Sequence, residues 1–371
     1  MKTRILTLGC ALAVVSLIVA TPAQAAPGIG DPQNTAEGLN SPLGLAIDQS
    51  GRAFVSDNSG GILSLIDKKG AETELVSAPG WEISAPGVSG KTVYYVQASQ
   101  DHLSSTLNTL SHGVTTPLAD IAAYEATENP DAVNTYGFFD LTAECEAQFV
   151  PFPPYPPLGM PNYPGIIDTH AYSSAIVGTD VYLADAGANA VLKVTAAGDI
   201  STVAVLPPSD PITVDAALAA ESNWPSCVIG HGYRTEPVPT DVELGPDGWL
   251  YVTTLPGGPE DPSLGARGSV YKVNPTTGAT QLVATGFVGA TNLAVAQNGT
   301  IFVTELFGGP TGSGQVSMVA AGASTPTVLL DLPMPATVSV RAEALYVTTN
   351  ALVPDAAALT VVKLKGMANR R

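Results

Sequence analysis

Residues 240–254, TDVELGPDGWLYVTT, decide the fold, because the chain repeats their pattern with other letters. An alternating apolar segment is followed by a short turn rich in Gly, Asp or Asn, and then by a strand of β-branched and aromatic residues. This is the pattern of a β-hairpin. It recurs at residues 292–305 (NLAVAQNGTIFVTE), 44–57 (GLAIDQSGRAFVSD), 172–185 (YSSAIVGTDVYLAD) and 336–349 (ATVSVRAEALYVTT). Such repetition along a chain predicts a repeat architecture.

Each hairpin is followed by sequence for further strands, and four strands in roughly 35 residues is the size of one propeller blade. We therefore predict an all-β fold, a six-bladed β-propeller over residues 31–366. The sixth unit ends before a fourth strand. We predict that residues 31–41 supply it and close the ring by pairing with the last blade, which also removes an exposed sheet edge. The six units are residues 43–77, 82–118, 171–205, 238–284, 290–332 and 336–364.

Two inserts interrupt the repeats. One lies at about residues 120–168, between the second and third blades, and the other at about residues 207–237, between the third and fourth. We expect helices at residues 121–128 and 213–221. The Pro-rich stretch at residues 149–164 favours extended, polyproline-like backbone.

The first 25 residues have the pattern of a secretory signal peptide. Lys2 and Arg4 precede an apolar stretch at residues 5–20, and the sequence AQA at residues 23–25 is a small-residue cleavage site. We expect cleavage after Ala25 and secretion of the mature protein. No later apolar stretch is long enough to predict a membrane span.

Two cysteines lie beyond this leader, Cys145 in the first insert and Cys227 in the second. In an exported protein such a pair is typical of a disulfide, and neither cysteine has a neighbour at zinc-ligand spacing. We predict a Cys145–Cys227 disulfide that joins the two inserts into one cap.

The composition narrows the choice of partners. A formal net charge of −18 at pH 7 repels phosphate backbones and anionic membrane surfaces, so nucleic acid is not expected as a partner. The chain has 37 Gly and 31 Pro but is also 45% hydrophobic, which indicates many turns around a packed core. We expect a monomer that binds a small molecule, a glycan or a protein.

The central channel of the predicted propeller has one mouth where the inserts crowd, and binding residues are commonly carried by loops on a rigid scaffold. The starts of the innermost strands and the ends of the second strands point to this mouth. Asp185 has a second interpretation, in which it accepts hydrogen bonds within the turn at residues 185–189. The candidate ligand-binding residues are Asp57, His170, Tyr172, Asp185, Asp241, Asn292 and Glu305.

Three of these residues, Asp241, Asn292 and Glu305, form a candidate metal site, because Ca²⁺ takes six to eight oxygen ligands. The alternative is that these side chains cap turns or accept hydrogen bonds from backbone N–H groups. No motif identifies a catalytic residue: the chain has no G-x-S-x-G, no H-E-x-x-H and no glycine-rich phosphate loop. Among the four scattered histidines, His170 is the best placed to act as a base.

Four stretches resemble a known family in matching order: residues 122–131 (AAYEATENPD), 182–194 (YLADAGANAVLKV), 238–248 (VPTDVELGPDG) and 270–273 (VYKV). They resemble the ScyD/ScyE family of exported bacterial proteins, which look like NHL-type six-bladed propellers. The resemblance covers nearly all of the mature chain and implies an NHL-like fold and export. The segments that carry the two cysteines depart from the family pattern. Fold similarity does not imply an activity.

We therefore expect a secreted propeller that acts as a binding or scaffold protein rather than as an enzyme, with its ligand at the channel mouth. The alternative is a metal-assisted hydrolase or lactonase of the six-bladed propeller type. It would use Asp241, Asn292 and Glu305 to hold Ca²⁺, and His170 as a base.

Overall fold

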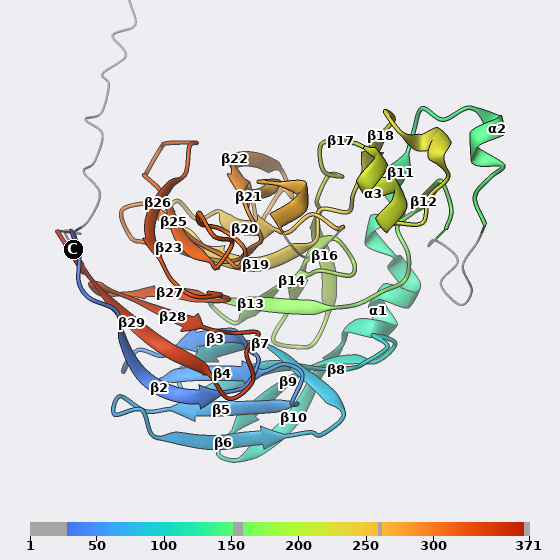
Figure 1. The fold of residues 1–371 in the computed structure, drawn as a ribbon. Helices are drawn as coiled ribbons and strands as arrows, with labels where there is room; N and C mark the ends of the chain where they lie inside the picture. Colours follow the sequence, from blue (N-terminus) through green and yellow to red (C-terminus); the bar gives the residue numbers. More distant parts are fainter. Residues whose placement is uncertain (1–27, 151–158, 259–261, 367–371) are drawn as a thin grey trace, which may run out of the picture.

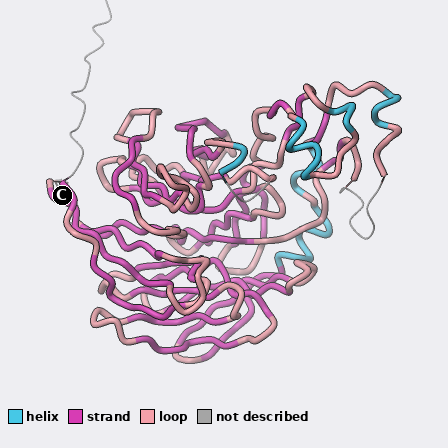
Figure 2. Tube along the Cα trace, viewed as in Figure 1, coloured by secondary structure: helices cyan, strands magenta, loops and turns pink. Residues whose placement is uncertain are grey.

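The computed structural model describes residues 28–150, 159–258 and 262–366. The predicted signal peptide, residues 1–25, lies outside the described residues, and so does the middle of the Pro-rich stretch, residues 151–158. The fold is all-β, with short helices gathered mainly in the inserts (Figures 1 and 2). Among the described residues no helix is long and apolar enough to cross a membrane.

Six antiparallel sheets form the blades, and five of them consist of four consecutive strands. Blade 1 is β3 (Pro42–Ile47), β4 (Ala53–Asp57), β5 (Ile62–Ile66) and β6 (Glu72–Ser77), and blade 2 is β7 (Trp81–Ser89), β8 (Thr92–Ser99), β9 (Ser105–Ser111) and β10 (Val114–Asp120). Blade 3 is β13 (Ala171–Val177), β14 (Asp180–Asp185), β15 (Ala190–Val194) and β16 (Ile200–Val205). Blade 4 is β19 (Pro239–Leu244), β20 (Leu250–Thr254), β21 (Gly268–Val273) and β22 (Thr280–Phe287), and blade 5 is β23 (Ala290–Val295), β24 (Ile301–Glu305), β25 (Gln315–Val319) and β26 (Thr327–Asp331).

Blade 6 is completed from the other end of the chain. Its own strands are β27 (Val338–Arg341), β28 (Ala344–Thr349) and β29 (Ala357–Lys365), and β2 (Gln33–Leu39) pairs antiparallel with β29 as the fourth. A further short strand, β1 (Gly28–Ile29), pairs with the end of β29. The first strands contact one another in the closed order β3, β7, β13, β19, β23, β27 and back to β3. The predicted six-bladed ring, closed by the entry segment, is therefore confirmed.

The second strand of each blade is largely buried because neighbouring blades cover both of its faces. In β20 and β24, for example, every residue is buried, so these strands are rich in β-branched and aromatic residues and do not alternate. Within the ring, the described buried apolar side chains form six clusters, one between each pair of adjacent blades. The propeller therefore has no single hydrophobic core. Its apolar side chains pack in a series of layers between neighbouring sheets.

The two inserts fold together beside the ring. Strands β11 (Thr135–Phe138) and β12 (Asn162–Pro164) of the first insert pair with β17 (Ile212–Thr213) and β18 (Gly232–Arg234) of the second, in the order β12-β11-β18-β17. Helices α2 (Ala143–Glu146) and α3 (Ala216–Glu221) and the 3₁₀ helix η2 (Ser226–Val228) complete this cap, at the upper right in Figure 1. Another 3₁₀ helix, η3 (Pro262–Leu264), belongs to the β20–β21 insert.

The predicted disulfide between Cys145 and Cys227 is present in the cap. It lies in a separate apolar cluster with Phe138, Val214 and Leu218. Of the cap helices, only α3 was predicted from the sequence; α2, η2 and the sheet were not, because they are short elements of two to four residues. The second predicted helix also begins later than expected, at Ala216, because the Asp215 side chain accepts a hydrogen bond from the Leu218 N–H and caps it there.

The predicted helix at residues 121–128 is confirmed as α1 (Ile121–Glu128), which leads from blade 2 towards the cap. The Asp120 side chain accepts a hydrogen bond from the Ala123 N–H and caps its start. The helix ends at Asn129, whose φ of 36° is left-handed, and the 3₁₀ helix η1 (Pro130–Val133) follows directly. Two successive short helices thus turn the chain sharply beside blade 3.

Candidate functional site

Glu82, His102 and His170 meet near the starts of β7 and β13, the first strands of blades 2 and 3, where the channel mouth is predicted. Glu82 is the second residue of β7, His102 lies in the loop between β8 and β9, and His170 directly precedes β13. One potential ligand atom from each side chain lies within 4.8 Å of those of the other two. We call these residues the mouth triad. Two imidazoles and one carboxylate at this spacing form a donor set that suits a divalent transition metal.

Glu82 is held in place from two sides. Its Oε1 atom lies 2.8 Å from Nε2 of His170 and accepts a hydrogen bond of 3.1 Å from Nδ2 of Asn58. The Asn58 amide is oriented in turn by Ser56, whose hydroxyl donates to Oδ1 over 2.7 Å. Burial alone would raise the pKa of Glu82, but the hydrogen bond and positive charge of His170 outweigh it and hold the pKa below its usual value.

His102 has its own carboxylate partner. Its Nδ1 atom lies 3.0 Å from Oδ1 of Asp168, at the end of the first insert. This hydrogen bond is the main reason why the pKa of His102 is raised. Because Asp168 engages Nδ1, the Nε2 atom of His102 remains the one available to a metal or a ligand. The His102 and His170 rings lie 4.3 Å apart between centroids, and both side chains keep about a quarter of their surface exposed, at 27% and 24%.

The backbone beneath His170 is anchored by Asp185, which is fully buried. Oδ1 of Asp185 accepts a hydrogen bond of 2.7 Å from the His170 N–H, and Oδ2 accepts one of 3.0 Å from the Thr169 hydroxyl. Oδ1 also accepts hydrogen bonds from N–H groups at residues 187 and 188, in the tight turn of blade 3. Asp185 therefore positions the mouth triad through the backbone, while the Tyr172 ring packs 5.6 Å from the His170 ring.

The structure thus brings together three of the residues predicted to bind a ligand, His170, Tyr172 and Asp185. Asp57 lies at the end of β4, where its Oδ1 atom accepts a hydrogen bond of 2.9 Å from the Gly60 N–H across the β4–β5 turn. Burial raises the pKa of Asp57.

The three residues predicted to hold Ca²⁺ bond to neighbouring strands. Asp241 accepts hydrogen bonds from the Ser173 hydroxyl and from the Leu293 N–H, so it links blades 3, 4 and 5. Oδ1 of Asn292 accepts a bond of 2.8 Å from the Val338 N–H of blade 6.

Glu305 bonds to the Val288 N–H over 2.7 Å and to the side chains of Gln315 and Ser317. These contacts agree with the alternative interpretation, that the side chains accept hydrogen bonds within the fold. A Ca²⁺ site at Asp241, Asn292 and Glu305 stays a prediction.

Two acidic side chains lie on the same face of β19, since Asp241 and Glu243 are two residues apart in a strand. Burial raises the pKa of both carboxyl groups, and the charge of Asp241 raises that of Glu243 further.

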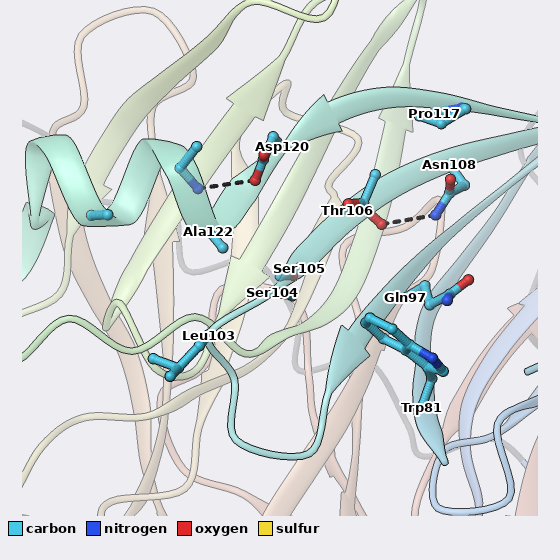
Figure 3. Close-up of a pocket in the computed structure, with 12 residues that line it drawn as sticks. Trp81, Gln97, Leu103, Ser104, Ser105, Thr106, Asn108, Pro117, Asp120 and Ala122 are labelled. Atoms are coloured by element: carbon cyan, nitrogen blue, oxygen red, sulfur yellow. Dashed lines mark hydrogen bonds between the residues drawn. The ribbon is translucent and has the colours of Figure 1, made fainter. Parts of the chain in front are cut away.

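A groove of about 560 Å³ runs along blade 2 beside the mouth triad. It is bounded by α1, β9 and the loop after β8, and Figure 3 shows Trp81 and Leu103 at its edge. Trp81 is 38% exposed and Leu103 is 68% exposed. These two residues directly precede Glu82 and directly follow His102, so the groove borders the same segments that carry the triad. Its volume is in the range of small-molecule sites.

Sequence reasoning missed Glu82, His102 and Asp168. The second repeat unit was too degenerate to align its inner strand with the others, so Glu82 was not nominated although it lies at the start of such a strand. His102 lies in an irregular loop and has a left-handed φ of 56°. The sequence indicated this region only through the residues nominated at blade 3, which are His170, Tyr172 and Asp185.

Comparisons with known proteins agree with the fold. No protein-family model and no curated protein match this sequence. The structure is similar to the PQQ-bound form of aldose sugar dehydrogenase from Streptomyces coelicolor, with 14% identity and a TM-score of 0.56 over 92% of this chain and 100% of that one. It is similar to a putative oxidoreductase (glucose dehydrogenase) from Thermus thermophilus, with 13% identity and a TM-score of 0.53 over 91% and 100%. A third similar structure is virginiamycin B lyase from Staphylococcus aureus, with 12% identity and a TM-score of 0.50 over 90% and 99%. At these identities the likeness extends to the fold alone.

Proposed function

We propose that this protein is a secreted propeller that binds a divalent transition-metal ion at the channel mouth and, through the metal, a small ligand. The observation that carries this proposal is the mouth triad, whose three potential ligand atoms lie within 4.8 Å of one another. Imidazole and carboxylate groups are common ligands of Zn²⁺, and three protein ligands leave a coordination position open for water or a ligand.

The surroundings of the triad support a metal site as well. Histidines that bind metals usually donate their other ring N–H to a carboxylate or carbonyl group. The contact between His102 and Asp168 has this form. The partial exposure of both histidines gives an ion access from solvent. The groove beside Trp81 offers room for the part of a ligand that does not touch the metal.

Family and export are parts of the same proposal. The four stretches that resemble the ScyD/ScyE family support membership in it, including residues 122–131 and 182–194. The leader pattern at residues 1–25 supports secretion. The Cys145–Cys227 disulfide supports it too, because disulfides persist in oxidising compartments.

Metal titration of the mature protein tests the proposal. We expect one Zn²⁺ or Co²⁺ per chain, with a visible Co²⁺ absorption band, and a loss of affinity of about a hundredfold in His102→Ala and His170→Ala. His112→Ala is the matched control, because His112 is an exposed histidine in a turn of the same blade and should leave binding unchanged. A native protein that binds no ion, or a His170→Ala variant that binds as tightly as the native protein, would contradict the proposal.

A second candidate function is metal-assisted hydrolysis, which the open coordination of a three-ligand site favours. Such a site can lower the pKa of a bound water and supply a nucleophile near neutral pH. The test is turnover of a panel of lactones and esters by Zn²⁺-loaded protein. Hydrolysis that is abolished in His170→Ala but retained in His112→Ala would favour an enzyme. Ligand binding by the native protein without turnover of any ester would favour a binding protein.

A further inference from the structure

Two buried carboxylates near the end of α1 have oxygen atoms without a partner. Glu125 is fully buried, and neither of its carboxylate oxygens has a hydrogen-bond partner. Asp131, in η1, is 1% exposed, and its Oδ1 atom also has none. A buried carboxylate without partners is costly, so these oxygens need an explanation.

Asn129 adds a third group of the same kind. Its side-chain Oδ1 atom is buried without a partner, while its Nδ2 donates a hydrogen bond of 3.1 Å to the Gly165 carbonyl. Asn129 lies four residues after Glu125 and caps the end of the same helix, where its backbone N–H donates a hydrogen bond of 2.9 Å to the Glu125 carbonyl. Gly165 packs tightly against Asp131, since a Cβ atom added there would lie 1.8 Å from Oδ1. The first insert therefore closes over Asp131 with no room for a larger residue.

These carboxyl groups have no cationic partner: among the described residues, no Lys or Arg forms an ion pair with Glu125 or Asp131. The pKa of Glu125 is raised to about 8, first by burial and then by the charges of Asp185 and Asp131. The pKa of Asp131 is raised to about 6, mainly by burial. Burial therefore disfavours the charged form of both carboxyl groups, and a bound cation would favour it.

The other carboxylate oxygens nearby already accept hydrogen bonds. Oδ2 of Asp131 accepts hydrogen bonds from the Tyr136 hydroxyl (3.0 Å) and from Nδ2 of Asn189 (2.8 Å). Both carboxylate oxygens of Asp185 already accept hydrogen bonds from N–H and hydroxyl donors, as described above. The unpartnered oxygens are therefore those of Glu125, Asn129 and Asp131 alone within this part of the described chain.

We propose that Glu125, Asn129 and Asp131 bind a calcium ion. The donors are all oxygen atoms, from two carboxylates and one amide, which is the ligand set that Ca²⁺ takes. A flexible, irregular arrangement suits Ca²⁺ better than Mg²⁺, which demands near-octahedral geometry and retains several waters. The absence of histidine among these donors separates the site from the mouth triad, which has a different metal preference.

A bound calcium ion would connect the first insert to blade 3. Asn189, which donates to Asp131, also accepts a hydrogen bond of 3.0 Å from the Val238 N–H at the entry to blade 4. The Glu125 carboxylate lies near the backbone N–H of Asp168, the residue that contacts His102. The ion would therefore hold the end of the first insert in place behind the mouth triad.

The test is calcium binding by mature protein that has been dialysed against EGTA. We expect calorimetry to find one Ca²⁺ per chain, and a thousandfold excess over the Kd to raise the Tm by about 5 °C. Glu125→Gln and Asp131→Asn should each lower the affinity by about a hundredfold. Glu128→Gln is the control, because Glu128 is exposed on the same helix, and should bind as the native protein does.

Other results would overturn the inference. One is a folded native protein whose Tm is the same in EGTA and in excess Ca²⁺, which can be judged even if Glu125→Gln does not fold. Another is a folded Glu125→Gln variant with undiminished affinity. A third is calcium binding that is lost in His170→Ala, because this would place the ion at the mouth triad. Zn²⁺ binding that persists in Glu125→Gln would show that the two sites are separate, so failure of either proposal can be recognised by itself.

Discussion

Breaking the Cys145–Cys227 disulfide should loosen the cap and leave the propeller ring intact. The bond joins residues 82 positions apart, and the whole of blade 3 lies between them. If the entire chain unfolds, the loop-entropy relation for 82 residues gives about 4.5 kcal/mol of stabilisation. If only the cap unfolds and blade 3 stays folded, the free loop shortens to roughly 45 residues, and the same relation gives about 4 kcal/mol.

The effect on the cap should be large because the cap has little else to stabilise it. Its four strands are two to four residues long, and its apolar cluster is separate from the six clusters of the ring. The perturbation is reduction of the native protein, which removes the cross-link without a substitution and adds only two hydrogen atoms. A loss of about 4 kcal/mol corresponds to opening that is roughly a thousandfold more frequent.

Hydrogen exchange followed by mass spectrometry measures this directly. Amides in residues 135–146 and 226–234 should exchange roughly a thousandfold faster after reduction. Peptides from blade 5, residues 290–331, are the control and should not change. Equal protection of the cap before and after reduction would refute the reasoning, and so would an equal loss of protection in blade 5.

Three further predictions concern the ring and its junctions. Asp48→Asn should destabilise the protein near neutral pH but not near pH 2. Burial alone would raise the pKa of Asp48. Hydrogen bonds from the Arg52 N–H and from Ser50, together with the charge of Arg52, outweigh burial and lower this pKa to about 2. A carboxylate with a lowered pKa contributes stability above its unfolded pKa and loses it as the pH falls from about 4 to about 2. With solvent screening this contribution is about 1 kcal/mol, measured by urea unfolding at several pH values. Gly187→Ala should lower the free energy of unfolding, measured by thermal unfolding, by about 2 kcal/mol, because the added Cβ atom would lie 2.6 Å from the Asp168 carbonyl oxygen. Gly257→Ala is the control and should leave this free energy unchanged, because no atom lies closer than 3.9 Å to its added Cβ atom. Deletion of residues 28–39 should expose the edge of β29 and produce oligomers in size-exclusion chromatography, and a deletion variant that stays monomeric with an unchanged Tm would contradict the role of β2 in closure.

Much of the propeller could be predicted because its sequence signals are local. The turn between β19 and β20 needs a residue with positive φ, which Gly248 supplies at 79°, and β20 after it is rich in β-branched and aromatic residues. The origin of the last strand of blade 6 could also be predicted, because the sixth unit has only three strands of its own and the entry segment belongs to no other blade. The disulfide followed from the number and position of the cysteines.

The mouth triad and the unpartnered oxygens near α1 could not be predicted in the same way. His102 and Asp168 are 66 residues apart, and His170 and Glu82 are 88 apart, so each contact depends on how two blades and an insert meet. Glu125 looks like an ordinary helical glutamate in the sequence, and only its complete burial without a partner distinguishes it. Burial and convergence are properties of the assembled ring and not of any local pattern.

The pairing of β2 with β29 has a consequence for the order of events during biosynthesis. Its registered pairs, such as Gln33 with Val361 and Leu39 with Ala357, join residues from opposite ends of the chain. A ribosome or a translocation pore delivers the amino-terminal partner first and the carboxyl-terminal partner last. The ring of blades therefore cannot close until nearly the entire polypeptide has emerged. Until then the earlier blades form an incomplete ring.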